Sequence, residues 1–484
     1  MRNRYITLII ALLLLPMAVG AQALKTSYFL DNSLQRMRLN PAFAPRANYL
    51  SLPVMSNTGV GVYCNLGPAD FLYPKNGELL TFLNSNVSVE EFSKNLPKEP
   101  GMDFEVETDI LSFGFYTKRK SFWSVDLGLR VDGRLGIARD FFMLAKKGMA
   151  TSTQTYSMKG FDIFQTSSAY AALGYSRDMS DVLKGLRVGL KFRAFLPVDH
   201  VGMTLGNTTL TLDKDRWAIH TEASGVMATS FLKVHPDALF GEENAPDLME
   251  TDMSQIGPAG FGAAIDLGAE WEMQLGTVVD GLTFSFAALD LGAYKFKEEH
   301  LQRFASKGDV AYAGLNDIEI SEGLDVNESV EALMDDFETL ANLEEVASEG
   351  GHMISTGPKI FAGVEYPFLK KTMSVGLLYS AKFGYSRAMN ELTVAYNLSP
   401  LKFFNLGVSY SFLNTTKTLG WMLEISPRGG FDIFVGSDYT FWEVMPAALP
   451  VIPVDKFFVN ARFGISLMLG SRHTKPEKKK KSKN

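Results

Sequence analysis

A set of charged side chains lies in segments where apolar and polar residues alternate, so their chemistry depends on what the polar face lines. The set comprises Arg130, Arg187, Lys191, Arg193, Asp266, Glu270, Glu391, Glu424 and Arg462. Alternation with period two places the polar residues of a strand on one face of a sheet. If that face lines a narrow interior, the charges either form a permeation path or pair with carboxylates such as Asp266 and Glu424 and fill the space. Both alternatives stay open.

Residues that could catalyse a reaction are few and scattered. The chain contains no G-x-S-x-G, H-E-x-x-H, P-loop or G-x-G-x-x-G motif. None of the six histidines has a helical metal-ligand spacing to another, and no nucleophile can be assigned by spacing to Asp199-His200. The single cysteine, Cys64, can form neither an internal disulfide nor a Cys-rich metal site. We therefore predict no enzyme, no cofactor and no metal site.

The elements that position these residues are predicted to be long strands. Apolar and polar residues alternate over Trp123–Asp132, Leu186–Ala194, Phe404–Phe412 and Val459–Leu469. Such strands pack on a second sheet in a soluble sandwich, or face lipid in a membrane barrel. Strands of about ten residues, charges on the polar face and aromatic residues near strand ends favour the barrel. The aromatic residues are Trp123, Tyr175, Trp271, Tyr366, Phe368, Tyr396, Phe403 and Phe457.

Counting the alternating segments predicts an all-β fold, a transmembrane antiparallel β-barrel of about 14 strands and possibly 16. The segments begin near residues 49, 108, 121, 164, 186, 202, 215, 259, 281, 357, 373, 389, 404, 418, 431 and 457. If both termini are periplasmic, short turns lie on the periplasmic side and long extracellular loops lie on the other, as is usual for barrels. The long loops are Leu66–Glu107, Arg134–Gly160, Phe231–Pro258, Gly292–Gly351 and Asp438–Lys456.

The N-terminus predicts export. Residues 1–23 have the positive, apolar and small-residue regions of a secretory signal peptide, with an A-x-A site at Ala21-Gln22-Ala23, although cleavage after Gly20 is also possible. No other stretch reaches 18 apolar residues, so a membrane location requires a closed barrel. The net charge of −7 argues against nucleic-acid binding. We predict a location in the cell outer membrane, in contact with its lipid.

Two segments depart from the barrel pattern. Residues 295–351 form an insertion in which Asp317–Glu349 holds 12 acidic residues and no Lys or Arg, with apolar residues at helical spacing. We expect an acidic amphipathic helix that covers the barrel mouth or faces a partner. Residues 471–484 hold seven Lys or Arg and one Glu. They predict a basic disordered tail, either solvated or in contact with lipid headgroups or an acidic periplasmic partner.

Short motifs resemble those of known barrels. Leu39–Ala44 contains Asn40, Pro41 and Ala42, an Asn-Pro-Ala element similar to that of the long-chain fatty-acid transporter superfamily and of the related barrels of the Bacteroidetes type IX secretion system. Ala264–Trp271 and Ala288–Gly292 resemble mid-barrel strands of the same proteins. The chain is similar in layout to a large uncharacterised Bacteroidetes group of such barrels. The resemblance implies a 14-stranded barrel with an N-terminal plug or hatch, which transports hydrophobic ligands in some members and binds proteins in others.

These observations divide the chain into a signal peptide (1–23), a plug or hatch segment (24–48), a barrel (49–470) and a tail (471–484). We expect passage or binding of a hydrophobic small molecule, with loops near 66–107 and 231–258 as a funnel leading to an apolar pocket. The alternative is a structural, assembly or secretion-associated barrel that binds protein partners and has a sealed lumen. For Asn40, the alternatives are a turn cap and a polar plug contact inside the barrel.

Overall fold

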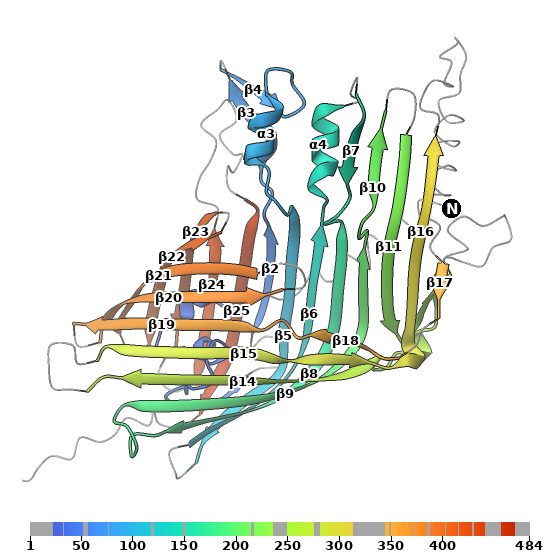
Figure 1. The fold of residues 1–484 in the computed structure, drawn as a ribbon. Helices are drawn as coiled ribbons and strands as arrows, with labels where there is room; N and C mark the ends of the chain where they lie inside the picture. Colours follow the sequence, from blue (N-terminus) through green and yellow to red (C-terminus); the bar gives the residue numbers. More distant parts are fainter. Residues whose placement is uncertain are drawn as a thin grey trace, which may run out of the picture.

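The computed structural model contains a closed ring of 14 antiparallel strands (Figure 1). In ring order these are β2 (Thr58–Cys64), β5 (Gly101–Tyr116), β6 (Ser121–Gly136), β8 (Asp162–Asp178), β9 (Leu186–Thr204), β14 (Gly260–Glu272), β15 (Thr283–Phe296), β19 (Lys359–Phe368), β20 (Met373–Phe383), β21 (Ala388–Leu401), β22 (Phe404–Leu413), β23 (Lys417–Ile425), β24 (Phe431–Thr440) and β25 (Phe458–Leu469). β1 (Asn48–Ser51) shares the position of β2, and β18 (His352–Ser355) shares that of β19. The ring closes because β25 pairs with β24 on one edge and with β1 and β2 on the other.

The structure describes most of the chain. The described residues are 23–31, 33–51, 57–75, 77–117, 121–148, 152–213, 217–235, 249–274, 281–312, 344–347, 350–369, 371–384, 388–401, 403–414, 416–427, 430–440 and 456–469. Residues 1–22 of the predicted signal peptide, the predicted acidic helix within 313–343 and the predicted tail lie outside them.

The predicted antiparallel β-barrel of 14 strands is confirmed, with two corrections to the predicted strands. The segment near residue 202 is the second half of β9 rather than a strand of its own. The segment near residue 215 corresponds to β11 (Trp217–Thr229), which lies outside the ring. Alternation identifies strands, but it does not show where one long strand leaves a barrel wall.

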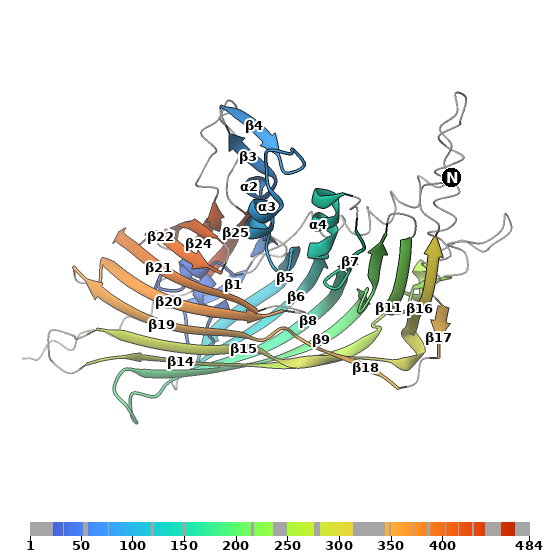
Figure 2. The same cartoon turned by 45° about the horizontal axis from the view of Figure 1, so that its top comes forward.

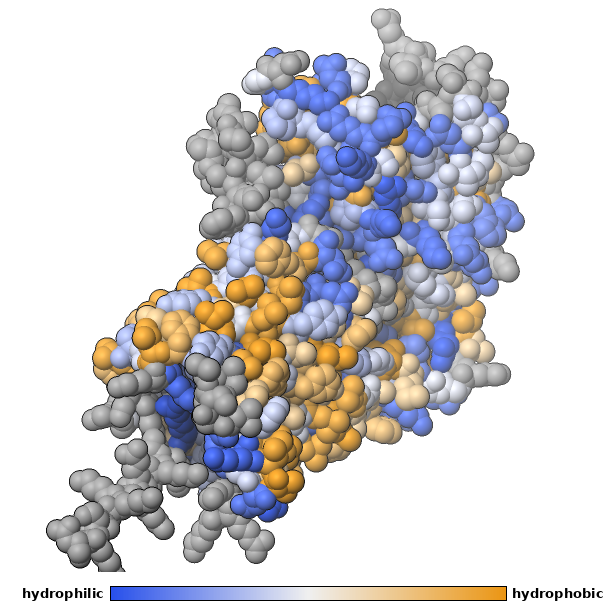
Figure 3. Space-filling model, turned by 60° about the vertical axis from the view of Figure 1, so that its left-hand side comes forward, coloured by the Kyte–Doolittle hydropathy of each residue, from blue (hydrophilic) through white to orange (hydrophobic). Residues whose placement is uncertain are grey.

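The outer face of the ring is an apolar belt. Large apolar side chains point outward from successive strands (Figure 3). Examples are Phe192, Ile265, Phe286, Val364, Leu377, Val394, Val408, Trp421, Val435 and Phe463. Aromatic pairs sit near the end of the ring where the turns are short, including Trp123 with Tyr175 at 4.8 Å between ring centroids and Phe368 with Tyr396 at 6.5 Å. We call this the short-turn end and the opposite one the long-loop end.

Among the described residues, no helix is both long and apolar enough to cross a membrane.

At the long-loop end, one side of the ring continues into a further sheet (Figure 2). The first half of β9 pairs with β14, whereas its last residues pair with β11. β11 then pairs with β16 (Leu301–Tyr312), and β16 with β17 (Glu344–Val346). The predicted insertion 295–351 is therefore wrong at its start: β15 runs to Phe296, and residues 301–312 form a strand. Residues 301–312 form a strand because the backbone N–H and C=O groups at the edge of β11 need hydrogen-bond partners.

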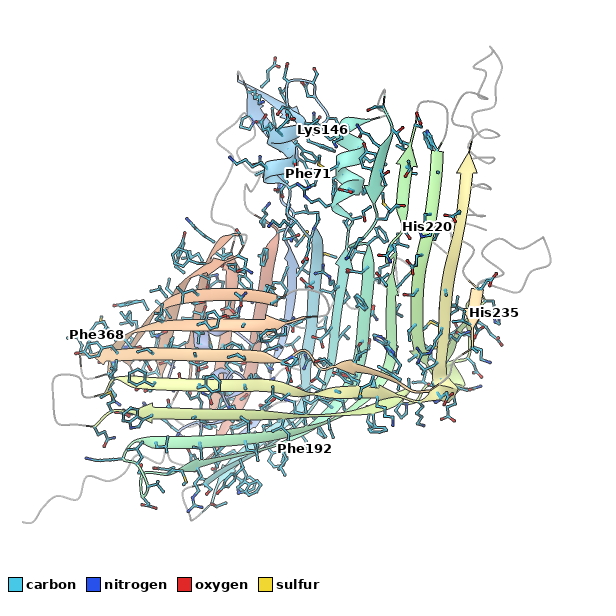
Figure 4. All side chains as sticks on the ribbon, in the orientation of Figure 1. Phe71, Lys146, Phe192, His220, His235 and Phe368 are labelled. Atoms are coloured by element: carbon cyan, nitrogen blue, oxygen red, sulfur yellow. The ribbon has the colours of Figure 1, made fainter. Side chains whose placement is uncertain are left out.

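A small cap completes the long-loop end. It contains α2 (Pro68–Phe71), β3 (Leu72–Lys75), β4 (Glu78–Thr81), α3 (Val89–Asn95), α4 (Arg139–Lys147), β7 (Gln154–Ser157) and β10 (Thr209–Leu212). Ser88 is the N-cap of α3, and its side chain accepts a hydrogen bond from Glu91 N. Gly148, which has a φ of 67°, is the C-cap of α4. An apolar cluster that includes Tyr73, Phe92 and Leu212 holds the cap together. Figure 4 shows Phe71 and Lys146 in this cap, and Phe368 far from it.

The described N-terminal residues, 23–31 and 33–47, lie inside the ring, and we call them the inner segment. They form two short 3-10 helices, η2 (Lys25–Ser27) and η3 (Gln35–Arg38). Tyr28, Phe29 and Phe43 pack with inward side chains of β15, β19, β20 and β21. The interior of the ring is therefore occupied by the chain's own N-terminal residues.

A labelling experiment tests the inner and outer faces. In a Cys64→Ser background, Val408→Cys should react with a lipid-soluble maleimide in detergent micelles, because Val408 faces the belt. Ser409→Cys should react at most slowly, since Ser409 is buried on the inner face. Mass spectrometry measures both, and preferential labelling at 409 would contradict the register.

Candidate binding cavity and the lumen beneath it

A cavity with a volume of about 640 Å³ lies at the long-loop end. Its walls come from β5, β6, β8, β9, β11, β15, β18 and β20, so the ring and the further sheet both build it. Phe104, Phe164, Val226, Ile354 and Phe383 supply apolar surface. The expected funnel is only partly found here: Asp103 and Phe104 line the cavity, whereas no described residue of 231–258 does. Ser224, Gly225 and Val226 of β11 line it instead, because β9 pairs with β11 at this height.

Charged residues also line the cavity, and each has a partner. Arg130 pairs with Asp132 at 2.5 Å, Lys382 pairs with Glu105 at 2.7 Å, and Arg134 holds Asp103 at 3.4 Å. Buried charges are costly unless they are paired, and these pairs cancel one another's charge. The cavity therefore combines apolar walls with neutralised ion pairs.

A layer of ion pairs lies within the ring, with Asp290 of β15 at its centre. The Asp290 carboxylate lies 3.0 Å from Arg130 of β6, 3.5 Å from Arg193 of β9 and 3.7 Å from Lys359 of β19. Lys359 also pairs with Glu105 at 3.1 Å. One carboxylate thus ties together four strands that are far apart in sequence.

A backbone irregularity places Asp290 there. Phe284 and Phe286 point outward, so strict alternation would turn residue 290 toward the apolar belt. Instead, the register between β14 and β15 shifts at this point, and Asp290 has a φ of 56°. Its backbone N–H donates to Asp266 Oδ1 at 2.8 Å, which supports the bulge. Sequence reasoning missed Asp290, and an acidic residue in the outward register of an apolar strand was the available signal.

The structure brings together most of the predicted lumen residues. Arg193 pairs with Asp266 at 2.9 Å, Lys191 pairs with Asp126 at 2.8 Å, and Arg462 lies 3.5 Å from Glu107. These pairs, with Arg130, belong to the same interior. The remaining predicted residues lie outside this group of pairs: Glu391 and Glu424 are buried on β21 and β23, and Arg187 and Glu270 are half-buried at the short-turn end.

The inner segment is tied to the wall by three cations. Lys25 pairs with Glu391, and its Nζ also donates to the Tyr439 hydroxyl at 2.5 Å. Arg36 lies 3.0 Å from Glu270. Arg38 lies 3.4 Å from Glu107 and also pairs with Asp109. The segment is therefore held at three separate places on the inner face.

Asn40 and Pro41 form a turn that packs directly on the wall. Asn40 Nδ2 donates to the carbonyl oxygens of Ala269 and Phe286, both at 3.2 Å, and Asn40 Oδ1 accepts from Ala42 N at 2.9 Å. The Ala42 carbonyl accepts a hydrogen bond from Ser176 Oγ at 2.9 Å. Asn40 thus caps its own turn and also contacts the barrel. A Cβ at Gly268 would lie 2.0 Å from Asn40 Oδ1, so the wall needs glycine for this approach.

Two histidines that the sequence did not indicate as a pair lie in contact at the cavity. His200 of β9 and His352 of β18 stack at 5.4 Å, and Phe296 stacks on His200 at 5.0 Å. Both histidines lie at the long-loop end, above the apolar belt of β9, which ends at Leu196. Burial, together with nearby His352, lowers the pKa of His200 to about 4, so its ring is neutral at pH 7. Because the two histidines are 152 positions apart in the sequence, no local spacing could reveal this contact.

Within the described residues, no group of three or more His, Cys, Asp or Glu side chains could hold a metal ion.

Replacing Asp290 tests the ion-pair layer. Asp290→Asn keeps a residue that tolerates positive φ but leaves Arg130, Arg193 and Lys359 without this carboxylate. We expect the free energy of unfolding, measured by urea titration in lipid vesicles, to fall by about 3 kcal/mol. Asp309→Asn, at an exposed position of β16, should change it very little. Equal effects of the two variants would contradict the central role of Asp290.

Filling the wall glycine tests the Asn40 turn. Gly268→Val should displace the turn, because its side chain would overlap Asn40 and Pro41. We expect faster proteolysis of the inner segment and a free energy of unfolding lower by about 2 kcal/mol, from lost hydrogen bonds. Ala269→Val places the same side chain on the outer face and should leave the proteolysis rate near that of the parent. An unchanged rate in Gly268→Val would argue against the contact.

Comparison with known proteins gives a family and similar folds. No curated protein matches significantly. The toluene transporter TbuX of Ralstonia pickettii is similar over 91% of this chain and 95% of its own, with 10% identity and a TM-score of 0.41. A FadL homologue from Pseudomonas aeruginosa is similar over 90% and 94%, with 10% identity and a TM-score of 0.37. A family model matches residues 41–438, and the chain therefore belongs to the family of unknown function DUF5723.

Proposed function

We propose that this protein binds a hydrophobic small molecule in the cavity at its long-loop end and takes part in its passage across the bacterial outer membrane. The observation that carries the proposal is the cavity itself, about 640 Å³ with Phe104, Phe164, Val226 and Ile354 in its wall. Cavities of about 300–1,000 Å³ with apolar walls and a few polar groups suit small ligands. The proposal includes no catalytic step and no cofactor.

The apolar belt supports a membrane location. Alternating apolar side chains on all sides of a closed ring suit lipid, and aromatic pairs near the strand ends suit the interface. Together with the predicted signal peptide, this favours the outer membrane, with the cap and cavity facing outward. Outer-membrane lipid is then the partner of the belt.

The inner segment is proposed as a plug. It fills the ring below the cavity and is held by ion pairs of Lys25, Arg36 and Arg38 with the wall. The solved barrels similar to this chain include toluene transporters by their own descriptions. Their likeness concerns the fold, and the cavity carries the functional proposal.

The layer around Asp290 favours a second candidate function. Its paired charges lie within the ring, and the cavity among Arg130, Arg193, Asp290 and Lys359 has a volume of only about 30 Å³. A barrel that binds a ligand or a protein partner without transporting anything would look the same. Binding and uptake must therefore be measured separately.

Binding is tested first, with an uncharged naphthylamine dye and the purified full chain in mild detergent. Val226→Trp places a bulky side chain in the cavity, so it should weaken dye binding by about tenfold or more, measured by fluorescence. Phe192→Trp on the outer belt is the matched control and should bind like the parent. Equal binding by all three proteins would remove the cavity as the binding site.

Uptake separates the two candidates. Cells that make the parent protein should take up the dye faster than cells that make Val226→Trp at the same outer-membrane level. If binding depends on the cavity but uptake does not, the protein binds without transporting. A stable protein partner co-purified from outer membranes, with no small molecule found by mass spectrometry, would favour the docking role.

A further inference from the structure

His200 is a buried polar residue in the wall of the cavity. His200 is 1% exposed, and its Nδ1 lies 2.9 Å from the backbone oxygen of Gln165. A carbonyl oxygen can only accept, so Nδ1 must carry the proton of the neutral ring. Nε2 is then an acceptor. The Thr166 hydroxyl oxygen also lies 2.9 Å from Nδ1.

The surroundings of His200 hold the ring and leave the Nε2 side open. Phe296 and His352 stack on it at 5.0 and 5.4 Å, with interplanar angles of 21° and 25°. Gly202 lies beside Nε2: a Cβ there would be 3.3 Å from this atom. Both Gly202 and His200 line the cavity, and no hydrogen bond from the described residues reaches Nε2. A bound molecule can therefore approach this acceptor from the cavity.

The charges around the cavity do not offer a site for an anion. The lining cations Arg130 and Lys382 are already paired with Asp132 and Glu105. A carboxylate ligand would have to compete with these buried pairs, and its oxygens would meet the lone pair of Nε2. Arg303, whose positive charge lies near His352, does not line the cavity. A neutral molecule with a hydroxyl group meets neither obstacle.

We propose that the cavity selects neutral hydrophobic molecules that carry a hydroxyl group, and that this hydroxyl donates a hydrogen bond to Nε2 of His200. The inference rests on the proposed binding function and specifies its ligand class. The apolar walls hold the hydrocarbon part, and His200 is the specificity-determining residue. A buried acceptor left without a donor costs free energy, so analogues lacking the hydroxyl bind more weakly.

The test uses three ligands that share a 4-alkylphenyl group: a 4-alkylphenol, its methyl ether and the matching 4-alkylbenzoate. Dissociation constants are measured by dye displacement on the purified full chain at pH 7. The parent protein should bind the phenol about tenfold or more tightly than the ether and the benzoate. His200→Phe should bind phenol and ether within about twofold of each other. His220→Phe, at an exposed position of β11 next to Asp309, should keep the parent preference.

A second variant guards against a folding defect. Gly202→Ala leaves the His200 side chain in place but narrows the approach to Nε2, so it should reduce the preference for phenol over ether. Equal binding of phenol and ether by the parent, or tightest binding of the benzoate, would overturn this inference while leaving the binding function intact. Absence of binding by all three ligands and by the dye would overturn the proposed function itself.

Discussion

The carboxylate of Asp290 pairs with Arg130, Arg193 and Lys359, and these four residues come from β15, β6, β9 and β19. A ring of 14 strands encloses a space that must be filled, and charge placed there must be neutralised. Each cation of this layer has at least one acid, and Lys359 and Arg193 reach second partners, Glu105 and Asp266. Pairs shared in this way connect distant strands through side chains as well as through the backbone ladder. The bulge at Asp290 keeps inside the ring the carboxylate that Arg130, Arg193 and Lys359 share.

The inner segment depends on the same wall in a different way. Its turn at Asn40 and Pro41 lies so close to β9 and β14 that Gly189 and Gly268 leave no room for a Cβ. Phe29 approaches β20 just as closely at Gly376. The absence of side chains at these points lets backbone and aromatic rings of the inner segment fill the space at van der Waals contact. Packing and ion pairing therefore act together: glycines admit the segment, and Lys25, Arg36 and Arg38 hold it.

The barrel could be predicted because its alternation is long-range and repeated, whereas the site depends on local exceptions to it. Period two alone placed Arg193 and Asp266 on the inner face, and the structure shows that they form an ion pair there. Asp290 was missed because a bulge reverses the face on which it lies. Residues 301–312 were expected to belong to a loop, because no local pattern indicates that β16 pairs with the edge of β11. The contact of His200 with His352 depends on a tertiary arrangement of β9 and β18 that sequence spacing does not encode.

The two functional candidates differ in what they require below the cavity. Binding needs only the walls at the long-loop end, where His200, Gly202 and Val226 come from strands that continue beyond the ring. Passage along the axis would also require the inner segment to leave its place. That movement would break the pairs Lys25–Glu391, Arg36–Glu270 and Arg38–Glu107 together with the Asn40 hydrogen bonds. Removing one partner from a buried pair costs about 3–5 kcal/mol, so the loss of these pairs would oppose the departure of the inner segment. A ligand can displace the inner segment only to the extent that it binds the protein more tightly with the segment displaced than with the segment in place. In a transporter, ligand binding in the cavity is therefore coupled to the release of the inner segment. In a binding protein, the two are independent.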